Sequence, residues 1–291
     1  MSAEETTSFP LKLIECPRDA MQGWKNFIPT KKKIAYINQL LKVGFDTIDF
    51  GSFVSAKAIP QMADTKEVIG QLSIGNSKTK LLAIIANVRG AKEAAEFDTI
   101  HYLGFPFSIS PTFQMRNTNS TIEQSFDHVR EIRSICDKSK KELVIYISMA
   151  FGNPYKDDYN EEIVLEWINK LVGEGVGIIS LADTVGVAEP SQVLSVTKEV
   201  MEAFIQTEIG VHLHSTHTNW RQKIDSALEA GCKRFDGALK GIGGCPMANN
   251  ELVGNMDSEL MISYFKEIGY CKEINNEALA ESIRMAGEIF V

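Results

Sequence analysis

The chain has 291 residues, of which 44% are hydrophobic and 23% are charged. This balance is that of an ordinary globular protein and excludes a disordered or fibrous chain. The formal net charge of −8 argues against nonspecific binding to nucleic acid or to an anionic membrane, so we expect neither as a partner.

The first residues and the cysteines indicate a reducing compartment. The start MSAEETT is polar and acidic, unlike a signal peptide, and no window reaches the ~20 continuous apolar residues of a membrane span. Five cysteines are scattered along the chain without a Cys-x-x-Cys pair: Cys16, Cys136, Cys232, Cys245 and Cys271. Free thiols of this kind are typical of cytoplasmic proteins, which is the location we expect.

Short apolar segments alternate with helical patterns along the whole chain. Strands are predicted at residues 11–16, 47–50, 80–86, 99–103, 142–150, 177–183, 209–214 and 234–239. Helices are predicted at residues 30–44, 60–72, 90–97, 120–136, 163–171, 190–204, 219–228, 258–268 and 276–290. Thr30 is predicted as an N-cap, and Ser120 with Glu123 as a capping box.

Eight strands that alternate with helices predict a single (β/α)8 TIM barrel over residues 1–291, with the helices from about 257 to 291 packed on or beside it. The strands are mostly apolar, as in a parallel sheet that is covered on both sides. The alternative fold is an open doubly wound sheet. It normally carries a Gly-x-Gly-x-x-Gly phosphate loop after its first strand, and none is present there.

The segment Val211-His212-Leu213-His214 places two imidazoles on the same face of an extended strand. Histidine is the commonest side-chain ligand for metals. A His-x-His pair also occurs as a hydrogen-bonded structural pair, so the companions of these histidines decide between the two interpretations.

Other polar residues follow the predicted strands and would converge at the carboxyl ends of the barrel strands, where TIM barrels hold their active sites. They are Arg18, Asp19, Asp49, Ser52, Asn87, Ser148, Asp183 and Thr184. An aspartate in such a place, Asp183 for example, is alternatively a turn residue or a helix cap. Two imidazoles with carboxylate and carbonyl-type oxygens suit a divalent cation. Without a thiolate in the set, Mg²⁺ or Mn²⁺ is favoured over Zn²⁺, which two histidines and one aspartate could also bind.

A glycine-rich segment, Gly241-Ile242-Gly243-Gly244-Cys245-Pro246, directly follows the eighth strand. Three glycines in four residues predict a loop that is free to close over a ligand, with a thiol at its tip. The alternative is a flexible turn with an incidental cysteine. Farther on, Gly254-Asn255 offers an amide oxygen of the kind that completes the shell of a hard cation.

Several of these motifs occur together, in order, in the 3-hydroxy-3-methylglutaryl-CoA lyase family, which the chain resembles from about residue 11 to 265. They are Pro17-Arg18-Asp19, the run 52–57 with Pro60-Gln61-Met62, Asp183-Thr184-Val185-Gly186, His212-Leu213-His214, the segment 241–246 and Gly254-Asn255. The Arg-Asp pair and the His-x-His strand are shared with the wider DRE-TIM metallolyases. The Gly-Gly-Cys-Pro loop and the Ser-Phe-Val-Ser run indicate the lyase.

The resemblance implies a role for each matching residue. Asp19, His212, His214 and Asn255 would be metal ligands. Arg18 would stabilise a thioester enolate, Cys245 would be a catalytic acid or base, and Asp49 and Asp183 would belong to the catalytic set. Gln22 and Lys25 are expected to bind substrate, Lys25 through the CoA phosphates, although it is alternatively a solvated loop lysine.

The chain also departs from the lyase pattern. Asp49 stands where the lyases usually have Glu, and Ala20-Met21 replaces Gly-Leu. Ser215 replaces an Asp, His217 replaces a Tyr, and Val144 stands about where an Arg is expected. These departures fall on the acyl pocket and on the residues behind the ligands rather than on the core chemistry.

The implied reaction is a metal-dependent retro-Claisen cleavage of 3-hydroxy-3-methylglutaryl-CoA, or a close 3-hydroxyacyl-CoA, to acetoacetate and acetyl-CoA. The base that takes the hydroxyl proton is His212 or Asp19. One alternative is a Claisen-type synthase of the isopropylmalate or homocitrate type, which usually carries an additional C-terminal region. Others are a hydroxy-keto acid aldolase and a non-catalytic barrel that binds metal and an acyl ligand. The expected partners are a small-molecule acyl-CoA and a second copy of the chain in a homodimer.

Overall fold

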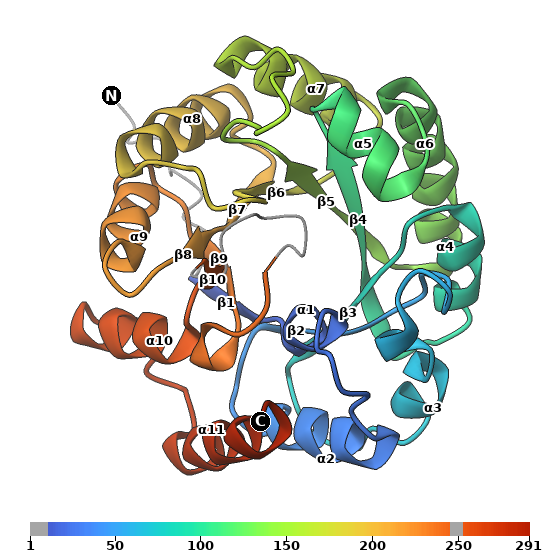
Figure 1. Ribbon diagram of the computed structural model, residues 1–291, viewed down its shortest axis with the longest axis vertical. Helices are drawn as coiled ribbons and strands as arrows, with labels where there is room; N and C mark the ends of the chain where they lie inside the picture. The colour runs from blue at the N-terminus through green and yellow to red at the C-terminus, as the bar shows by residue number, and fades with distance from the viewer. Residues whose placement is uncertain (1–10, 245–252) are drawn as a thin grey trace, which may run out of the picture.

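Figure 1 shows a ring of helices around a central barrel of strands. The structure is a computed structural model, and it describes residues 11–244 and 253–291. The barrel strands are β1 Lys12–Glu15, β2 Thr47–Ser52, β3 Lys80–Ile84, β4 Ile100–Ser108, β5 Glu142–Ser148, β6 Ile178–Ala182, β7 Glu208–His212 and β9 Arg234–Gly237. They pair in parallel in this order, and β1 also pairs with β9. The predicted TIM barrel is therefore confirmed, and the open sheet is excluded because the first and last strands meet.

The helices follow the strands in alternation and cover the outside of the barrel. They are α1 Pro17–Gln22, α2 Thr30–Leu40, α3 Thr65–Ile69, α4 Val88–Ala95, α5 Pro111–Thr118, α6 Ile122–Ser139, α7 Glu161–Gly173, α8 Pro190–Ala203, α9 Trp220–Glu229, α10 Ser258–Glu267 and α11 Asn276–Ile289. Two 3₁₀ turns are η1 Pro60–Met62 and η2 Leu239–Gly241. The last helix, α11, lies beside α2 near the start of the chain (Figure 1).

Alternate residues of each strand face opposite sides of the barrel wall, and this decides which side chains reach the site. On β9, Phe235 points outward and packs on Phe265 of α10, with ring centroids 5.0 Å apart. Its neighbours Arg234 and Asp236 therefore face the interior. An interior apolar cluster, which includes Val144 and Tyr146 of β5, fills part of the barrel.

A second, very small sheet lies outside the barrel proper. The strands β8 His214–Ser215 and β10 Gly254–Asn255 pair in antiparallel fashion, with Asn255 opposite His214. This pairing brings Asn255, which follows the glycine-rich segment by nine positions, next to the second histidine. Figure 1 shows both strands beside β9 and β7.

Several details of the sequence-based assignment were wrong or incomplete. β4 continues to Ser108, well past the predicted end at residue 103, and includes Gly104, next to which the side chain of Ile84 packs: a Cβ on Gly104 would lie 2.6 Å from its Cδ1. The helices α1 and α5 were missed. The capping box is formed by Thr121 and Gln124, one residue later than predicted. Thr30 is the first helical residue, and Pro29 precedes it as the N-cap.

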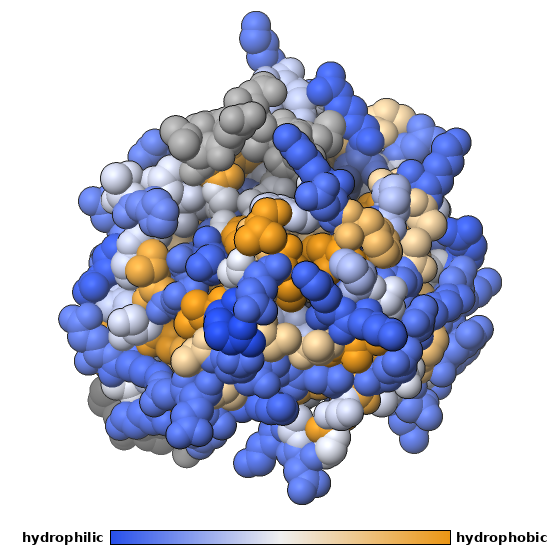
Figure 2. Space-filling model, turned by 60° about the horizontal axis from the view of Figure 1, so that its bottom comes forward, coloured by the Kyte–Doolittle hydropathy of each residue, from blue (hydrophilic) through white to orange (hydrophobic). Residues whose placement is uncertain are grey.

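The surface is largely hydrophilic, and the apolar side chains in Figure 2 gather near the middle of the face shown. Within the described ranges, the helices are too short or too polar to cross a bilayer.

Candidate metal and substrate site

The Arg-Asp pair is placed at the barrel mouth by an abrupt change from strand to helix. β1 ends at Glu15, and Pro17 occupies the first turn of α1. Proline has a backbone angle that suits a helix start, so the chain turns directly at the end of the strand. Arg18 and Asp19 consequently lie in the first turn of α1, where each is only 8% exposed.

Arg18 is clamped on the carboxylate of Asp49, which comes from β2. Its Nε and Nη2 lie 3.0 and 2.5 Å from Oδ2 of Asp49. Burial raises the pKa of Asp49 to about 6, against the opposing effect of the Arg18 charge. Nη1 of Arg18 also donates to Asp19 Oδ1 at 3.0 Å and to Gln22 Oε1 at 2.9 Å. The guanidinium is therefore fixed from three sides before any substrate binds.

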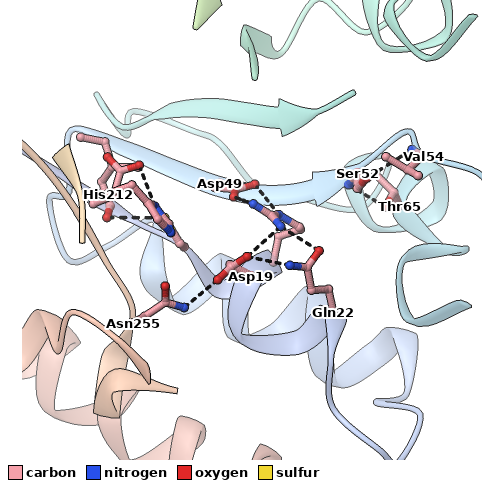
Figure 3. Close-up of polar contacts among 12 residues, drawn as sticks. Asp19, Gln22, Asp49, Ser52, Val54, Thr65, His212 and Asn255 are labelled. Carbon is pink, nitrogen blue, oxygen red and sulfur yellow. Dashed lines mark hydrogen bonds and ion pairs between the residues drawn. The ribbon is translucent and has the colours of Figure 1, made fainter. Parts of the chain in front are cut away.

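Asp19 is the centre of the polar contacts in Figure 3, with Gln22 on one side and Asn255 on the other. Its Oδ1 accepts from Nε2 of Gln22 and its Oδ2 from Nδ2 of Asn255, both at 2.7 Å. Burial works to raise the pKa of Asp19, but the charges of Arg18 and His212 and the bond from Asn255 together lower it. Asp19 is thus held as a carboxylate.

The two histidines converge on this carboxylate from a broken strand. His212 ends β7, and His214 begins β8. They were expected on one continuous strand, but the chain leaves the barrel sheet between them, and their ring centroids lie 5.5 Å apart. One ligand atom from each of Asp19, His212 and His214 lies within 4.8 Å of the others. This spacing is compatible with three ligands of one ion.

The donor set fits a divalent cation, because two of its buried polar atoms accept no hydrogen bond from the described residues. Nε2 of His214 and Oδ1 of Asn255 have no hydrogen-bond partner within the described parts of the chain. Buried polar atoms are rarely left in that state unless a water or an ion satisfies them. Burial, followed by the charge of His212, lowers the pKa of His214 to about 4, so this imidazole is neutral and able to bind a metal.

Asp183 lies behind the site rather than in it. Its Oδ2 accepts from Nζ of Lys223 at 2.7 Å, and its Oδ1 accepts from the backbone N–H of Ala188 at 3.1 Å. Both members of the ion pair are completely buried. Nζ of Lys223 also donates to the carbonyl of His214 at 2.8 Å. Asp183 therefore reaches the histidine only through Lys223 and the backbone.

A cavity of about 470 Å³ opens beside the candidate ligands. Arg18, Asp19, Gln22, His212 and His214 line its polar side. Arg116 of α5 lies on the rim and stacks over the ring of Tyr155, 4.7 Å from its centroid.

Lys25, a predicted substrate contact, is not brought to this cavity. Lys25 is exposed and is not among the residues that line it. Cys245 lies outside the described residues. The described residue Gly243, two positions before Cys245, is in contact with the site, because a Cβ on it would lie 2.7 Å from Nδ2 of Asn255.

Asp236 was missed by sequence reasoning, although it touches a candidate ligand. Its Oδ2 lies 3.2 Å from Nδ1 of His212. Burial works to lower the pKa of His212, and the hydrogen bond and charge of Asp236 outweigh it and raise that pKa. The available signal was the alternation Arg234-Phe235-Asp236, in which two charged residues flank an apolar one. Cys16 lies near the same pair, but burial raises the pKa of its thiol well above the ordinary value, which disfavours metal binding there.

Comparison with known proteins identifies the family of the chain. The family model described as HMGL-like matches residues 12–285. The chain belongs to the HMGL-like family. The hydroxymethylglutaryl-CoA lyase YngG of Bacillus subtilis is 30% identical over 272 residues, which cover 94% of this chain and 90% of that protein. The cytoplasmic 3-hydroxy-3-methylglutaryl-CoA lyase of Rattus norvegicus is 32% identical over 260 residues, 89% of this chain and 75% of that protein.

Solved structures of HMGL-like relatives have the same fold. An HMG-CoA lyase from Acinetobacter baumannii, in complex with coenzyme A and 3-methylmalate, superimposes with a TM-score of 0.88 at 33% identity and covers 100% of this chain and 93% of that chain. The HMG-CoA lyase of Bacillus subtilis superimposes with a TM-score of 0.90 at 29% identity and covers 96% and 93% of the two chains.

Proposed function

We propose that this HMGL-like protein is a carbon–carbon lyase that cleaves 3-hydroxy-3-methylglutaryl-CoA, or a close 3-hydroxyacyl-CoA, to acetyl-CoA and acetoacetate. The observation that carries the proposal is the convergence of Asp19, His212, His214 and Asn255 beside the fixed guanidinium of Arg18. A divalent cation and an anionic substrate can thus be bound side by side, since Asp19, His212, His214 and Arg18 line one cavity.

We propose Asp19, His212, His214 and Asn255 as the ligands of a divalent cation. The oxygen and imidazole donors of these four residues favour Mg²⁺ or Mn²⁺ over Zn²⁺. Such an ion supplies Lewis-acid polarisation of the substrate oxygens and lowers the pKa of a hydroxyl that it binds. Asn255 suits this role because its amide nitrogen is held by Asp19 and by the carbonyl of Ile242, while its amide oxygen has no partner among residues 11–244 and 253–291.

We assign to Arg18 the stabilisation of the negative charge that develops on the substrate during cleavage. Breaking the carbon–carbon bond leaves an enolate on the thioester, and a preorganised cation next to its oxygen lowers the barrier. Asp49 holds the guanidinium through two nitrogens, so the cation does not need to reorganise during the reaction. The shorter Asp49 in place of the usual Glu therefore still reaches Arg18.

Cys245 is the proposed proton donor to the enolate carbon, and Gln22 and Arg116 are the proposed substrate contacts. Support for Gln22 comes from its place in the cavity wall next to Arg18, and for Arg116 from its position on the rim as a second cation. A rim cation suits the phosphates of an acyl-CoA in a chain with an overall charge of −8.

We further propose a homodimer in the cytoplasm, to be tested by light scattering and by cell fractionation.

A metal-dependent assay on the purified protein tests the reaction. We expect release of acetoacetate from 3-hydroxy-3-methylglutaryl-CoA, its loss after chelation and its recovery when Mg²⁺ or Mn²⁺ is added back. Condensation of acetyl-CoA with 2-oxo acids, without acetoacetate release, would instead identify a synthase. Metal binding without turnover of any CoA thioester would identify a non-catalytic barrel.

A further inference from the structure

Below the candidate metal site, the sheet register places four residues side by side on the inner wall of the barrel. Tyr146 of β5 pairs with Ser180 of β6, Ser180 with Gly210 of β7, and Gly210 with Arg234 of β9. Asp236 lies two residues beyond Arg234 on the same strand, so it faces the interior one level higher, beside His212.

Arg234 occupies this level because Gly210 leaves room for it. The arginine is only 1% exposed, and a Cβ on Gly210 would lie 2.7 Å from its Cδ. Nη1 of Arg234 donates to Oε1 of Glu208 at 3.1 Å, toward the opposite end of the barrel from the site. The rest of the guanidinium stays inside the barrel.

The polar atoms of this level and of Asp236 above it are donors and acceptors that could satisfy one another, but no direct hydrogen bond joins them in the described part of the chain. Nε and Nη2 of Arg234, the hydroxyls of Tyr146 and Ser180, and Oδ1 of Asp236 are all buried without a hydrogen-bond partner in the described part of the chain. Two of the five atoms are donors from a cation, and one is an acceptor from a carboxylate. A buried water molecule typically makes about three hydrogen bonds to groups of this kind.

Asp236 connects this level to the site above it. Its other oxygen, Oδ2, is 3.2 Å from Nδ1 of His212. A carboxylate that accepts the Nδ1–H of a histidine fixes the ring orientation and leaves Nε2 unprotonated to bind a metal.

We propose that Arg234 and Asp236 are positioning residues for His212, joined to each other through water that is bound next to the hydroxyls of Tyr146 and Ser180. The bound water satisfies the guanidinium and Oδ1 of Asp236, and the fixed carboxylate aims His212 at the metal. The inference rests on the metal site of the proposed function and deepens it, because it adds a polar chain that runs down the barrel axis away from the substrate cavity.

The test is the affinity for Mn²⁺, measured from the electron paramagnetic resonance signal of the free ion. The Asp236→Asn variant should raise the Kd about 10–100-fold, the range seen when a residue behind a metal ligand is changed. An asparagine can present its NH₂ group to Nδ1 and thereby select the wrong tautomer. The Arg234→Met variant keeps the stem and removes the cation, and it should raise the Kd about tenfold, at the lower end of that range. Arg234→Lys should restore part of the loss.

Lys12→Met is the matched control. Lys12 pairs with Arg234 in the sheet and also binds Glu208, at 2.7 Å, but it is not part of the unpaired set. Its removal should leave the Kd for Mn²⁺ unchanged. Arg234→Met should remain folded, because Glu208 keeps Lys12 as a partner. Thermal unfolding of the metal-free variants checks this.

The outcomes separate the inference from the proposed function. A wild-type Kd in both Asp236→Asn and Arg234→Met, even with a lower Tm, would mean a merely structural role and overturn the inference alone. No Mn²⁺ binding by the wild-type protein would overturn the metal site as well. A crystal structure should show water between Arg234 and Asp236, and a direct ion pair without water would overturn the bridged arrangement.

Discussion

Arg18 and Asp49 form a two-pronged ion pair at the mouth of the barrel, with Nε and Nη2 of the arginine 3.0 and 2.5 Å from the same carboxylate oxygen. The aspartate is 1% exposed, so solvent does not compete for the arginine. The pair fixes the direction of the guanidinium toward the substrate cavity.

Replacing Arg18 should therefore slow the reaction without removing the ion. For Arg18→Gln we expect kcat to fall about 10²–10³-fold, the usual cost of losing an oxyanion donor. The Kd for Mn²⁺ should stay within a few-fold of the wild-type value. The exposed Arg284→Gln variant, in which the lost contacts are surface pairs with Glu281 and Glu288, should change neither quantity. Loss of Mn²⁺ binding by Arg18→Gln would contradict the assigned role.

Gly243→Ala should weaken metal binding by crowding the ligands. A Cβ at this position would lie 2.7 Å from Nδ2 of Asn255 and 2.9 Å from the carbonyl of Asp19. Gly152→Ala is the matched control, because Gly152 also has a positive φ but has nothing within 4 Å of its Cβ position. Both variants should lose about 1–2 kcal/mol of stability from backbone strain. Only Gly243→Ala should raise the Kd for Mn²⁺, and equal Kd values for the two variants would argue against crowding.

Asp183→Ala should destabilise the fold because it leaves the buried charge of Lys223 without its ion-pair partner. The change strands the charge of Lys223, which is completely buried, and breaking such a pair costs about 3–5 kcal/mol. Urea unfolding of the metal-free protein measures the loss. Glu166→Gln, which breaks an exposed pair with Lys170, should cost at most about 1 kcal/mol. If Asp183→Ala were as stable as Glu166→Gln, the buried pair would not be the source of stability that we infer.

The stability of the protein should fall between about pH 5 and pH 8 because of Glu15. Burial raises the pKa of this carboxyl to about 8 from its ordinary value of 4.5, against the hydrogen bonds from Ser258 and Leu239. Folding therefore favours the protonated form, so this contribution is complete below pH 4.5 and is lost as the pH rises toward 8. Each pKa unit corresponds to about 1.4 kcal/mol, so the upper bound is a few kcal/mol.

Glu15→Gln tests this dependence, because the amide is neutral at every pH. The free energy of unfolding is measured in urea for both proteins. The difference between the variant and the wild type should shift in favour of the variant by up to a few kcal/mol between pH 5 and pH 8. The exposed Glu67→Gln variant should follow the wild-type curve. Parallel curves for Glu15→Gln and wild type would show that Glu15 does not titrate in this range.

Cys245→Ala should give a folded protein that binds metal and is nearly inactive, because the proposed proton donor to the enolate carbon is lost. Cys271→Ala provides a control, since Cys271 lies after α10 and away from the site residues. Near-normal turnover of Cys245→Ala would remove the cysteine from the mechanism.

The barrel could be predicted from the sequence because its signal repeats: every strand is short, apolar and followed by a helical pattern. The ends of elements were harder to predict. A glycine such as Gly104 suggests the end of a strand, and only the structure shows that β4 continues through it with Ile84 packed beside it. The convergence of Asp19 with the two histidines follows from the rule that barrel sites gather at strand ends. The antiparallel pairing that brings Asn255 to His214 joins segments with no local signal of contact.

The buried charges were the least predictable part of the site. Asp183 looked catalytic, and only the structure shows that Lys223 engages its carboxylate. The resemblance to the lyases made Val144 look like the loss of a cation on the fifth strand. In the structure, Val144 packs within the barrel interior, and the guanidinium of Arg234 reaches the same region from β9, 5.9 Å from the ring centroid of Tyr102. Which side chains of different strands share one region of the barrel interior cannot be seen when positions are compared one at a time.

Asp19 and Asn255 are 236 positions apart in the chain and joined by a single 2.7 Å hydrogen bond. All of the chain from Asp19 to Asn255 must be synthesised before these two groups can meet. Nascent or C-terminally shortened chains that stop before residue 255 thus lack the complete ligand set, however well their early βα units have formed.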